Sequence, residues 1–297
     1  MLKVQQISKS YKGRTVLKEI DFDAERGTII GLVAPNGTGK TTLLQIIMNF
    51  VVPDAGQIVL DDQYNYRTKQ STVEMYRHIS FLPELDDVYE ELSGRDHLKL
   101  YARMWNKTDR SVNGIVEQLN MESYIKRPVK TYSLGMRQRM CFAMLLAADT
   151  DIMLMDEVMN GLDPDNVQLI TDQLLALKEQ GKTILIASHL LENLDIYADR
   201  ILFLKEGDII ADVPAAEKRE TFIKIYATRE EIKKLKADKH WRWEAELEAD
   251  QLYAIPLKDM EPEETSSILT YLIQEGYSRV SLGEIGTMEL YASYYGV

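Results

Sequence analysis

Short apolar runs alternate with longer stretches in which apolar positions recur every three to four residues, over roughly the first two thirds of the chain. The short runs predict strands at residues 3–7, 19–24, 28–33, 57–60, 78–82, 152–155, 183–187 and 201–204. The longer stretches predict helices at residues 41–50, 95–105, 136–148 and 166–180. Several strand-like runs are apolar at consecutive positions, as strands buried on both faces are. The alternation predicts an α/β fold with a largely parallel sheet.

Two segments depart from this alternation. Between about residues 86 and 148 helical patterns dominate, which predicts an inserted helical subdomain. Near residue 214 the composition changes, and residues 213–220 have the character of a linker. The patterns beyond it predict a strand at 222–226, an alternating strand through Trp241, Trp243, Ala245 and Leu247, a helix at 262–274 and a strand at 277–282. We expect two domains, residues 1–213 and a small α+β domain at 214–297.

Composition narrows the classes of function. A formal net charge of −12 argues against broad nucleic-acid binding, which needs clustered Lys and Arg. The single cysteine, Cys141, lies in an apolar stretch, so we interpret it as a buried side chain and expect a reducing compartment. That stretch falls well short of the ~20 apolar residues that span a bilayer, and the N-terminus lacks a signal pattern. We expect a cytoplasmic protein that reaches a membrane only through a partner.

The strongest chemical signal is the glycine-rich sequence of residues 31–42, GLVAPNGTGKTT, between a predicted strand and a predicted helix. Strand, glycine-rich turn and helix form the arrangement that binds the phosphates of a nucleotide. Gly37 and Gly39 have no Cβ, so backbone N–H groups there can curl around phosphate oxygens. Lys40 can reach the outer phosphates, and the Thr41 hydroxyl can bind Mg²⁺.

Two carboxylates, Asp156 and Glu157, follow the apolar run at 152–155. At the end of a strand, Asp156 can hold Mg²⁺ through water, and Glu157 can polarise an attacking water. A positioned general base contributes about 10²- to 10⁴-fold in rate. The alternative is an ordinary strand end with two solvated acids. The second carboxylate favours hydrolysis of ATP over phosphoryl transfer to a substrate.

Three further residues have both a functional and a purely structural interpretation. Ser133 precedes an apolar helix, where it either only caps the helix or helps the helix N-terminus bind an anion. His189 follows the predicted strand at 183–187, where ligands bind in open α/β sheets, although a lone His is usually structural. Tyr11 either stacks on adenine or is an ordinary surface tyrosine.

Taken in their order along the chain, these elements resemble the ATP-binding subunit of an ABC transporter over residues 1 to about 213. The matching elements are an aromatic loop at Tyr11, a phosphate loop at Ala34–Thr41, a Q-loop at Phe81–Glu84, a signature motif at Tyr132–Met136, the carboxylates Asp156 and Glu157, a D-loop at Asn160–Asp163 and a switch histidine at His189. The resemblance implies the ABC-type cassette of the P-loop NTPases, a mixed-sheet core with an inserted helical subdomain. It also implies ATP and Mg²⁺ as cofactors.

The resemblance further implies roles for individual residues. Glu157, His189 and Lys40 would be catalytic, and Thr41, Glu84 and Asp156 would hold the metal. The residues implied to contact ATP are Tyr11, Ala34, Pro35, Asn36, Gly37, Thr38, Gly39, Lys40, Thr41, Thr42, Glu84, Ser133 and Gly135. The family implies a head-to-tail dimer of like or unlike subunits. Each ATP would lie between the phosphate loop of one subunit and the Ser133 and Gly135 of the other.

This chain departs from the family pattern at four positions. Ala34 replaces the first glycine of the phosphate loop, and alanine fits there only with a negative φ. In the signature motif Leu134 replaces a glycine and Met136 a glutamine, whereas the serine and the second glycine are kept. Glu84 stands where the family has glutamine. A carboxylate is an equally good ligand for Mg²⁺, but it adds negative charge beside the γ-phosphate.

A separate transmembrane permease is the main partner that the resemblance implies. Its cytoplasmic helices would meet the region of residues 84–105, on the inner face of the cell membrane. The acidic residues clustered there either meet a basic coupling element or form a solvated face. The segment at 280–290 resembles one that closes many export-type cassettes, which favours an exporter.

Two alternatives stay open at this point. One is a non-transport ABC ATPase, although translation-factor types carry two cassettes and DNA-repair types a long coiled coil. This chain has one phosphate loop and no sustained heptads. The other is an ATP-dependent sensing or regulatory module, which the C-terminal domain supports.

The Q-loop substitution leads to a test. We expect Glu84→Gln to change the rate of ATP turnover or its Mg²⁺ requirement, because the variant removes a negative charge beside the γ-phosphate. Steady-state ATPase assays over a range of Mg²⁺ concentrations measure both quantities. An unchanged rate and an unchanged Mg²⁺ dependence would contradict the prediction.

Overall fold

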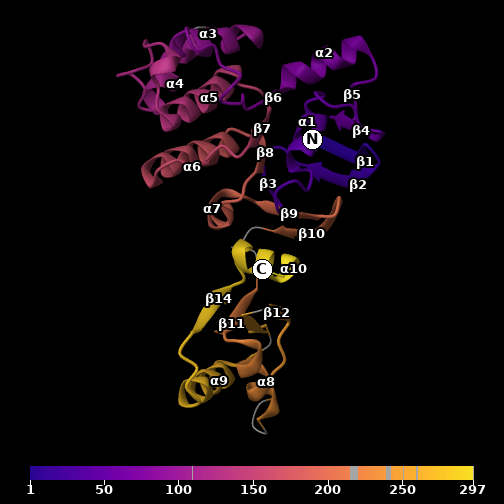
Figure 1. The fold of residues 1–297 in the computed structure, drawn as a ribbon, viewed down its shortest axis with the longest axis vertical. Coiled ribbons are helices and arrows are strands. Elements are labelled where there is room, and N and C mark those ends of the chain that lie inside the picture. The colour runs from indigo at the N-terminus through magenta and orange to yellow at the C-terminus, as the bar shows by residue number, and fades with distance from the viewer. Residues whose placement is uncertain (109, 215–219, 239–241, 250, 259, 297) are drawn as a thin grey trace. The chain divides into compact units, whose positions relative to one another are not determined.

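The computed structural model describes residues 1–108, 110–214, 220–238, 242–249, 251–258 and 260–296, shown as a ribbon in Figure 1. The chain falls into two units. The first comprises residues 1–190 and 197–213, and the second comprises residues 191–196 and 214–297. In the described part of the chain, every helix is too short or too polar to span a membrane.

A six-stranded sheet in the order β10-β9-β3-β8-β7-β6 forms the centre of the first unit. Its strands are β3 (Ile29–Val33), β6 (Ile79–Phe81), β7 (Ile152–Asp156), β8 (Thr183–Ala187), β9 (Arg200–Lys205) and β10 (Asp208–Pro214). β3 pairs in parallel with β8 and β9, and β7 pairs in parallel with β6 and β8. All residues of β3 and β8 are buried, which agrees with their unbroken apolar sequences. Because parallel strands end at the same edge, the loops after β3, β6, β7 and β8 meet there.

An antiparallel sheet in the order β2-β1-β4-β5 accounts for the mixed character of the first unit. Its strands are β1 (Leu2–Tyr11), β2 (Arg14–Ala24), β4 (Ala55–Leu60) and β5 (Tyr64–Asn65). β1 and β2 are longer than predicted, because pairing continues through polar, partly exposed positions up to Tyr11 and Arg14. Lys12 and Gly13 form the turn between these two strands.

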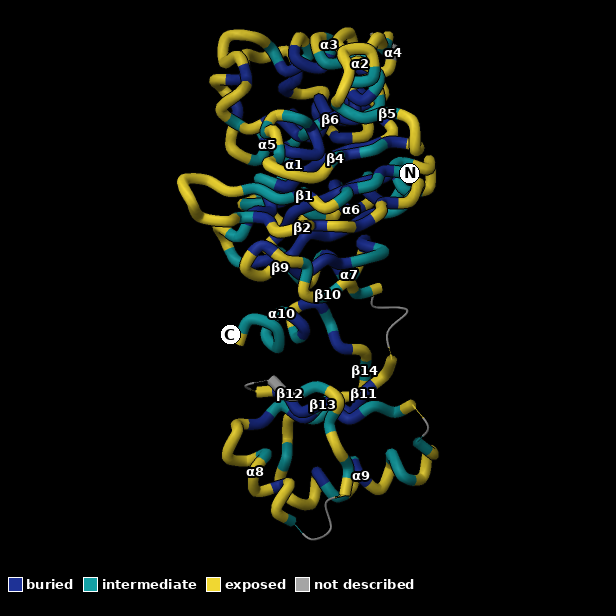
Figure 2. Tube along the Cα trace, turned by 90° about the vertical axis from the view of Figure 1, so that its right-hand side faces the viewer, coloured by how far each residue is buried: buried dark blue, intermediate teal, exposed yellow. Residues whose placement is uncertain are grey.

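The helices of the first unit lie between its strands in sequence. They are α1 (Lys40–Ile47), α2 (Lys69–His78), α3 (Gly94–Met104), α4 (Arg110–Gln118), η1 (Val129–Thr131), α5 (Leu134–Ala148) and α6 (Pro164–Glu179). α1 contacts β7 and β8, while α3, α4 and α5 contact one another. Figure 2 shows buried segments running through the middle of this unit. Cys141 on α5 is buried, as predicted, and burial raises its pKa to about 12.

Some predicted boundaries are wrong by a few residues. The helix predicted at 41–50 ends at Ile47, because Asn49 adopts a left-handed conformation with φ of +63°. The strand predicted at 277–282 is found at Val280–Glu284, because residues 277–279 form the loop after α9 (Pro262–Gln274), where the Tyr277 N–H donates back to the Leu272 carbonyl of the helix at 2.9 Å. Local backbone conformation, rather than hydrophobicity, sets both of these ends.

The second unit has its own sheet, in the order β12-β13-β11-β14, and its own core. Its elements after residue 214 are β11 (Thr221–Tyr226), α8 (Arg229–Ala237), β12 (Leu247–Ala249), β13 (Leu252–Pro256), α9 (Pro262–Gln274), β14 (Val280–Glu284) and α10 (Thr287–Tyr295). The order β-α-β-β-α-β from β11 to β14 is the ferredoxin-like arrangement. α8 and α9 lie on one side of the sheet (Figure 2) and bury Leu235, Ile268 and Leu272 against Ile223 and Ile225. This unit also includes most of α7 (Leu191–Tyr197).

The strand predicted from the alternation of tryptophan and small apolar residues is wrong for most of its length. The strand β12 starts only at Leu247, and Trp241 lies outside the described residues. Trp243 and Ala245 still pack against the core of the second unit, and Trp243 Nε1 donates a hydrogen bond of 2.8 Å to Glu264 Oε1 on α9. Packing against the core therefore explains the alternation without strand pairing, and Trp243 is a packing residue.

A partly buried ion pair joins β11 to α10 within the second unit. Lys224 Nζ lies 2.9 Å from Glu289 Oε1, and the Tyr226 hydroxyl donates to the same carboxylate. Burial alone would raise the pKa of Glu289, but the hydrogen bonds from Tyr226 and Lys224 outweigh it and hold this pKa below its usual value. A carboxylate whose pKa is lowered by folding adds its full contribution to the stability of the fold at pH values above its unfolded-state pKa. That contribution to stability is lost as the pH falls through the folded-state pKa.

We therefore expect Glu289→Gln to destabilise the second unit by about 1–3 kcal/mol at pH 7, the usual contribution of hydrogen bonds to a charged group. Hydrogen–deuterium exchange of residues 221–226 should rise in this variant. The difference from the wild type should be fully present above the ordinary pKa of glutamate, about 4.3, and should fade as the pH falls through the lowered folded-state pKa of Glu289. Glu220→Gln is the control, since it breaks an exposed pair with Lys258 and should change little. Equal effects of the two variants would contradict the prediction.

Candidate functional site

The loops at the carboxyl edge of the parallel sheet and the β1–β2 hairpin line a cavity of about 590 Å³ in the first unit. Its lining residues are Tyr11, Val16, Asn36, Gly37, Gly39, Lys40, Thr41, Thr42, Phe81, Leu82, Pro83, Glu84, Asp156 and Glu157. Tyr11, Glu84 and Asp156 are far apart in the sequence, yet they share this cavity. The fold therefore brings the predicted aromatic loop, phosphate loop, Q-loop and carboxylates to one place.

The phosphate loop depends on two glycines in left-handed conformations. Gly37 has φ of +76° and Gly39 has φ of +110°. A Cβ on Gly39 would also lie 2.9 Å from Leu17 Cδ2 and 3.1 Å from the Val16 carbonyl oxygen. Both the backbone conformation and the close approach of β2 therefore require glycine there. Ala34 has a negative φ, which is the condition under which alanine fits at its position.

Lys40, the first residue of α1, is only 6% exposed. Its Nζ donates a hydrogen bond of 2.6 Å to the carbonyl oxygen of Ala34 and lies 3.4 Å from that of Pro35. Burial lowers the pKa of Lys40, whereas the negative charges of Glu157 and Asp156 raise it. A buried ammonium group facing a cavity is a suitable partner for a phosphate.

Ala34, Pro35 and Thr38 were predicted to contact the nucleotide, but they are not among the residues that line the cavity. Their hydrogen bonds within the chain lie inside the loop and shape it. The carbonyl oxygens of Ala34 and Pro35 accept hydrogen bonds from Lys40, and the Thr38 hydroxyl donates to the Pro35 carbonyl at 2.6 Å. The residues of the loop that line the cavity are Asn36, Gly37, Gly39, Lys40, Thr41 and Thr42.

The oxygen ligands expected for Mg²⁺ lie together. Thr41 Oγ1 donates a hydrogen bond of 2.5 Å to Asp156 Oδ2, and Glu84 lines the same cavity. Burial raises the pKa of Asp156; the Thr41 hydrogen bond opposes this rise, and the charge of Glu157 adds to it. A divalent cation would relieve this electrostatic cost.

No cluster of three or more His, Cys, Asp and Glu side chains able to hold a metal is found among the residues the structure describes. Mg²⁺ usually binds one or two carboxylates and completes its coordination with waters and substrate phosphates. The hydroxyl of Thr41 and the carboxylate of Asp156 therefore fit a nucleotide-bound Mg²⁺ better than a metal held by the protein alone.

Glu157 is held by contacts on several sides. Its N–H donates to the Ala187 carbonyl of β8 at 2.9 Å, and its backbone is left-handed, with φ of +53°. One carboxylate oxygen, Oε1, lies 3.4 Å from His189 Nδ1, and the other accepts a hydrogen bond from Asn160 Nδ2. A non-glycine residue in this conformation costs on the order of 1–3 kcal/mol, and such residues cluster at functional sites.

The signature motif lies apart from this cavity. The Ser133 hydroxyl accepts a hydrogen bond of 3.3 Å from the Met136 N–H, so it caps α5 as predicted. Ser133 and Gly135 are absent from the residues that line the cavity, and the side chain of Leu134 is 53% exposed. Within one chain, Ser133 and Gly135 therefore do not meet the phosphate loop.

Analysis of the sequence alone missed two kinds of residue. Val16 and Phe81 line the cavity without any polar signal, because the sequence does not show which side chains of a hairpin or loop face a ligand. Asn160 and Gln138 carry hydrogen bonds that lead to Glu157. Asn160 lies in the predicted D-loop and Gln138 in the helix predicted at 136–148, but only the fold shows that they touch.

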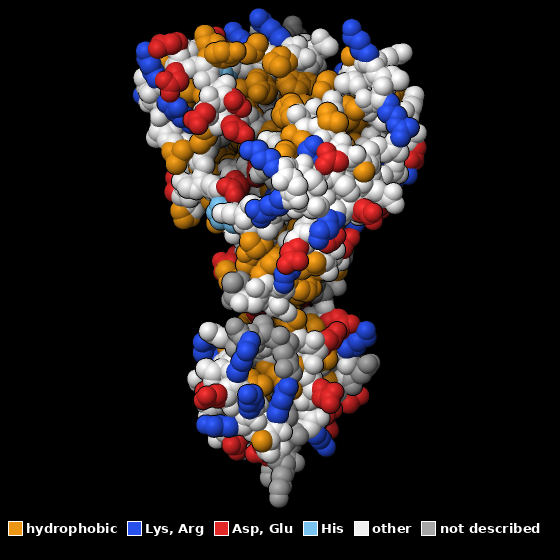
Figure 3. All heavy atoms as spheres, turned by 45° about the vertical axis from the view of Figure 1, so that its right-hand side comes forward, with side chains coloured by type: hydrophobic (Ala, Val, Ile, Leu, Met, Phe, Trp, Pro, Cys, Tyr) orange, Lys and Arg blue, Asp and Glu red, His pale blue; other side chains and the backbone are white. Residues whose placement is uncertain are grey.

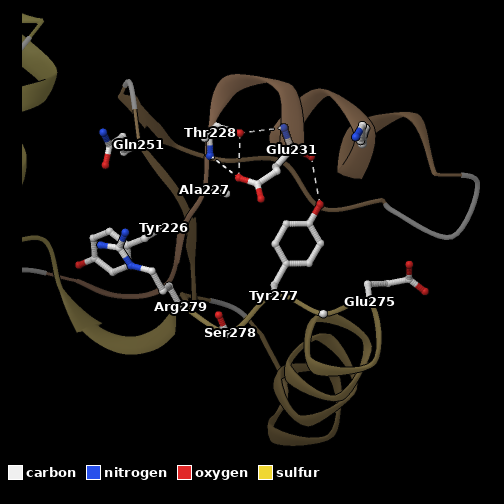
Figure 4. Close-up of a pocket in the computed structure, with 11 residues that line it drawn as sticks. Tyr226, Ala227, Thr228, Glu231, Gln251, Glu275, Tyr277, Ser278 and Arg279 are labelled. Carbon is white, nitrogen blue, oxygen red and sulfur yellow. Dashed lines mark hydrogen bonds between the residues drawn. The ribbon is translucent and has the colours of Figure 1, made fainter.

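A second cavity, of about 480 Å³, lies in the second unit between the first turn of α8 and the loop after α9 (Figure 4). Thr228 and Glu231 form a capping box at the start of α8, and the Tyr277 hydroxyl donates a hydrogen bond of 3.0 Å to the Glu231 carbonyl oxygen. The Arg279 guanidinium lies over the Tyr226 ring, 5.5 Å from its centroid. Of these contacts, the hydrogen bond between Tyr277 and Glu231 attaches the loop to α8, whereas Arg279 packs on Tyr226 of β11.

Comparison with known proteins supports the family resemblance. A profile of the ABC transporter family matches residues 17–160. The lantibiotic transport ATP-binding protein SrtF of Streptococcus pyogenes is 32% identical over 212 residues, which cover 71% of this chain and 90% of that protein. The doxorubicin resistance ATP-binding protein DrrA of Mycobacterium tuberculosis is 33% identical over 232 residues, covering 75% and 69%. The Nod factor export ATP-binding protein I of Bradyrhizobium diazoefficiens is 31% identical over 211 residues, covering 69% and 68%.

Solved structures share the same fold. The structure of cbiO1 from Clostridium perfringens, part of an ABC transporter complex, has a TM-score of 0.64 and 25% identity, covering 73% of this chain and 89% of that chain. A dimeric ATP-binding cassette bound to ADP and Pi in a post-hydrolysis state has a TM-score of 0.65 and 21% identity, covering 72% and 99%. The predicted cassette fold is confirmed. This chain therefore belongs to the ABC transporter family, as one of its ATP-binding and ATP-hydrolysing subunits.

Proposed function

We propose that this subunit hydrolyses Mg²⁺-ATP at the interface of a head-to-tail dimer and drives a separate transmembrane permease that exports its substrate. The names of three relatives support export or resistance: lantibiotic transport, doxorubicin resistance and Nod factor export. The subunit would lie on the inner face of the cell membrane and contact the membrane only through the permease. Residues 1–213 would form the ATP-binding domain and residues 214–297 an accessory domain.

The observation that carries most weight is the arrangement of catalytic groups around the cavity. Lys40 and the N–H groups of Gly37 and Gly39, all residues that line the cavity, would bind the β- and γ-phosphates. Thr41 and Asp156, with Glu84 nearby, would hold Mg²⁺, which neutralises charge on the outer phosphates when it is bound.

Hydrolysis then needs a base for the attacking water. Glu157 lines the cavity beside Asp156, and its carboxylate would take a proton from water as the water attacks the γ-phosphate. His189, 3.4 Å from that carboxylate, would orient it and contact the γ-phosphate region. Tyr11, which is 44% exposed at the edge of the cavity, offers its ring to adenine.

The geometry of the signature motif supports a site shared between two subunits. A Cβ on Gly135 would lie 3.6 Å from Leu162 Cδ2 and 4.0 Å from Asn166 Nδ2, which are ordinary contact distances. The chain itself therefore leaves room for alanine, unlike at Gly39. A nucleotide bound to another subunit and approaching the backbone of Gly135 closely would explain why glycine stands at this position.

The surface beside the Q-loop is suited to receive a permease helix. Exposed hydrophobic side chains in this region are Tyr89, Leu92, Leu100 and Met104. Figure 3 shows hydrophobic side chains gathered over the end of the first unit that carries α2 and α3. Two of the nearby acids already have partners in the same chain, since Glu90 pairs with Arg137 and Glu91 with Lys130. The support for docking therefore comes from the hydrophobic side chains rather than from the acidic cluster.

Substitution of the proposed base tests the hydrolytic mechanism. We expect Glu157→Gln to lower ATP turnover by about 10²-fold or more, because it removes the proton acceptor while keeping the shape of the side chain. ATP should then hold the subunits together, which size-exclusion chromatography with ATP detects as a dimer. Undiminished hydrolysis would remove Glu157 from the role of base.

Substitution of the signature glycine tests the shared site. We expect Gly135→Ala to lower ATPase activity about tenfold or more, because a methyl group would obstruct the partner's nucleotide. Thermal unfolding and nucleotide binding by the single subunit should stay unchanged, since the chain has room for the methyl group. Gly114→Ala on α4, where nothing lies within 4 Å of the added Cβ, is the matched control. Full activity of Gly135→Ala would contradict a shared site.

A further inference from the structure

A chain of hydrogen bonds leads from α5, which begins after the signature serine, to the carboxylate of Glu157. Gln138 Nε2 donates to the carbonyl oxygen of Asn160, and Asn160 Nδ2 donates to Glu157 Oε2. The N–H of Asn160 also donates to the Glu157 carbonyl at 3.2 Å. Asn160 is therefore held by Gln138 at its backbone, and its side chain in turn holds the carboxylate.

We propose that Gln138 is a positioning residue, which aligns Glu157 through Asn160 and ties this alignment to the signature end of α5. The proposal rests on the proposed role of Glu157 as the base. Gln138 lies five residues after Ser133, the N-cap of α5, a rise of about 7.5 Å along the helix axis. A displacement of Ser133 by nucleotide from the partner subunit would therefore reach Gln138 through a rigid helix.

The burial of Gln138 argues that stability alone does not explain this residue. Its side chain is only 9% exposed, and its Oε1 has no hydrogen-bond partner among the described atoms. A buried acceptor without a partner is unfavourable, because it loses its hydrogen bonds to water and gains none in return. An apolar side chain of the same size would avoid this cost. The amide is therefore better explained by the hydrogen bond that it donates to Asn160.

The next residue of α5 holds the far end of the D-loop. Arg139 Nη2 donates to Asn166 Oδ1, and Asn166 Nδ2 donates to Asp163 Oδ2 at 2.7 Å. The Asp163 side chain also caps α6 by accepting from the Asn166 N–H at 2.9 Å. Gln138 and Arg139 thus attach α5 to both ends of the segment 160–166, so that this segment would follow any movement of the helix.

The test uses Gln138→Met, which keeps the length of the side chain and removes the donor. We expect kcat for ATP to fall about 10- to 100-fold, the cost of a misplaced catalytic group, while KM changes less than about twofold. Asn160→Ala should behave alike, and the double variant should lose no more than the worse single variant. Gln118→Met, at an exposed glutamine on α4, is the control and should leave kcat unchanged.

Hydrogen–deuterium exchange gives a readout that does not depend on activity. In Gln138→Met, exchange should rise in residues 157–163 but stay unchanged in β7 and β8. A fall in kcat accompanied by general unfolding of the core and weaker nucleotide binding would show a merely structural role and overturn the proposal.

Measuring the ATPase activity of Glu157→Gln in the same assay distinguishes failure of the positioning role of Gln138 from failure of the proposed role of Glu157 as the base. If Glu157→Gln is inactive while Gln138→Met keeps the wild-type kcat, the positioning role is wrong and the proposed base stands. If Glu157→Gln itself hydrolyses ATP at the wild-type rate, the proposed function of Glu157 fails, and the positioning role fails with it.

Discussion

The parallel pairing of β3, β7 and β8 is the constraint on which the rest of the site depends. Asp156 lies beside Ala187 in the register of β7 and β8, and Leu32 of β3 lies beside the same alanine from the other side. The carboxyl ends of these three strands therefore lie next to one another at one edge of the sheet. Each strand is followed in the sequence by a loop that belongs to the site. Because main-chain hydrogen bonds fix this register, a slip of one residue would turn each strand's side chains to the opposite face.

Hydrogen bonds beyond the strand ends extend this order into the loops. The N–H of Glu157 donates to the Ala187 carbonyl at 2.9 Å, and the N–H of Leu82 donates to the Leu154 carbonyl at 2.8 Å. These bonds bring Glu157, the proposed base, and the Q-loop to the same edge of the sheet as the phosphate loop. The left-handed backbone of Glu157 is maintained by surroundings that are already fixed, as expected for strain at a functional site.

Opposite charges lie close together around the cavity, where Lys40 is buried and the two acids, Asp156 and Glu157, are partly buried. Lys40 is nearly buried, and Asp156 has its pKa raised by burial and by the adjacent Glu157. The positive charge of Lys40 neutralises the negative charges of Asp156 and Glu157 only in part, because Lys40 donates its hydrogen bonds to loop carbonyls rather than to either acid. A nucleotide with its cation would bring both a partner for the ammonium group and a positive charge for the acids.

The amino-acid sequence by itself determined the local elements and the chemistry that they carry. Unbroken apolar runs predicted β3 and β8, and the order of short motifs predicted the cassette, because burial pattern and turn chemistry are local properties. Only the tertiary structure decided which groups touch. Gln138 and Asn160 are 22 residues apart, and Thr41 and Asp156 are 115 residues apart. Sheet register and helix packing bring such pairs together, and neither can be read from a single segment of the chain.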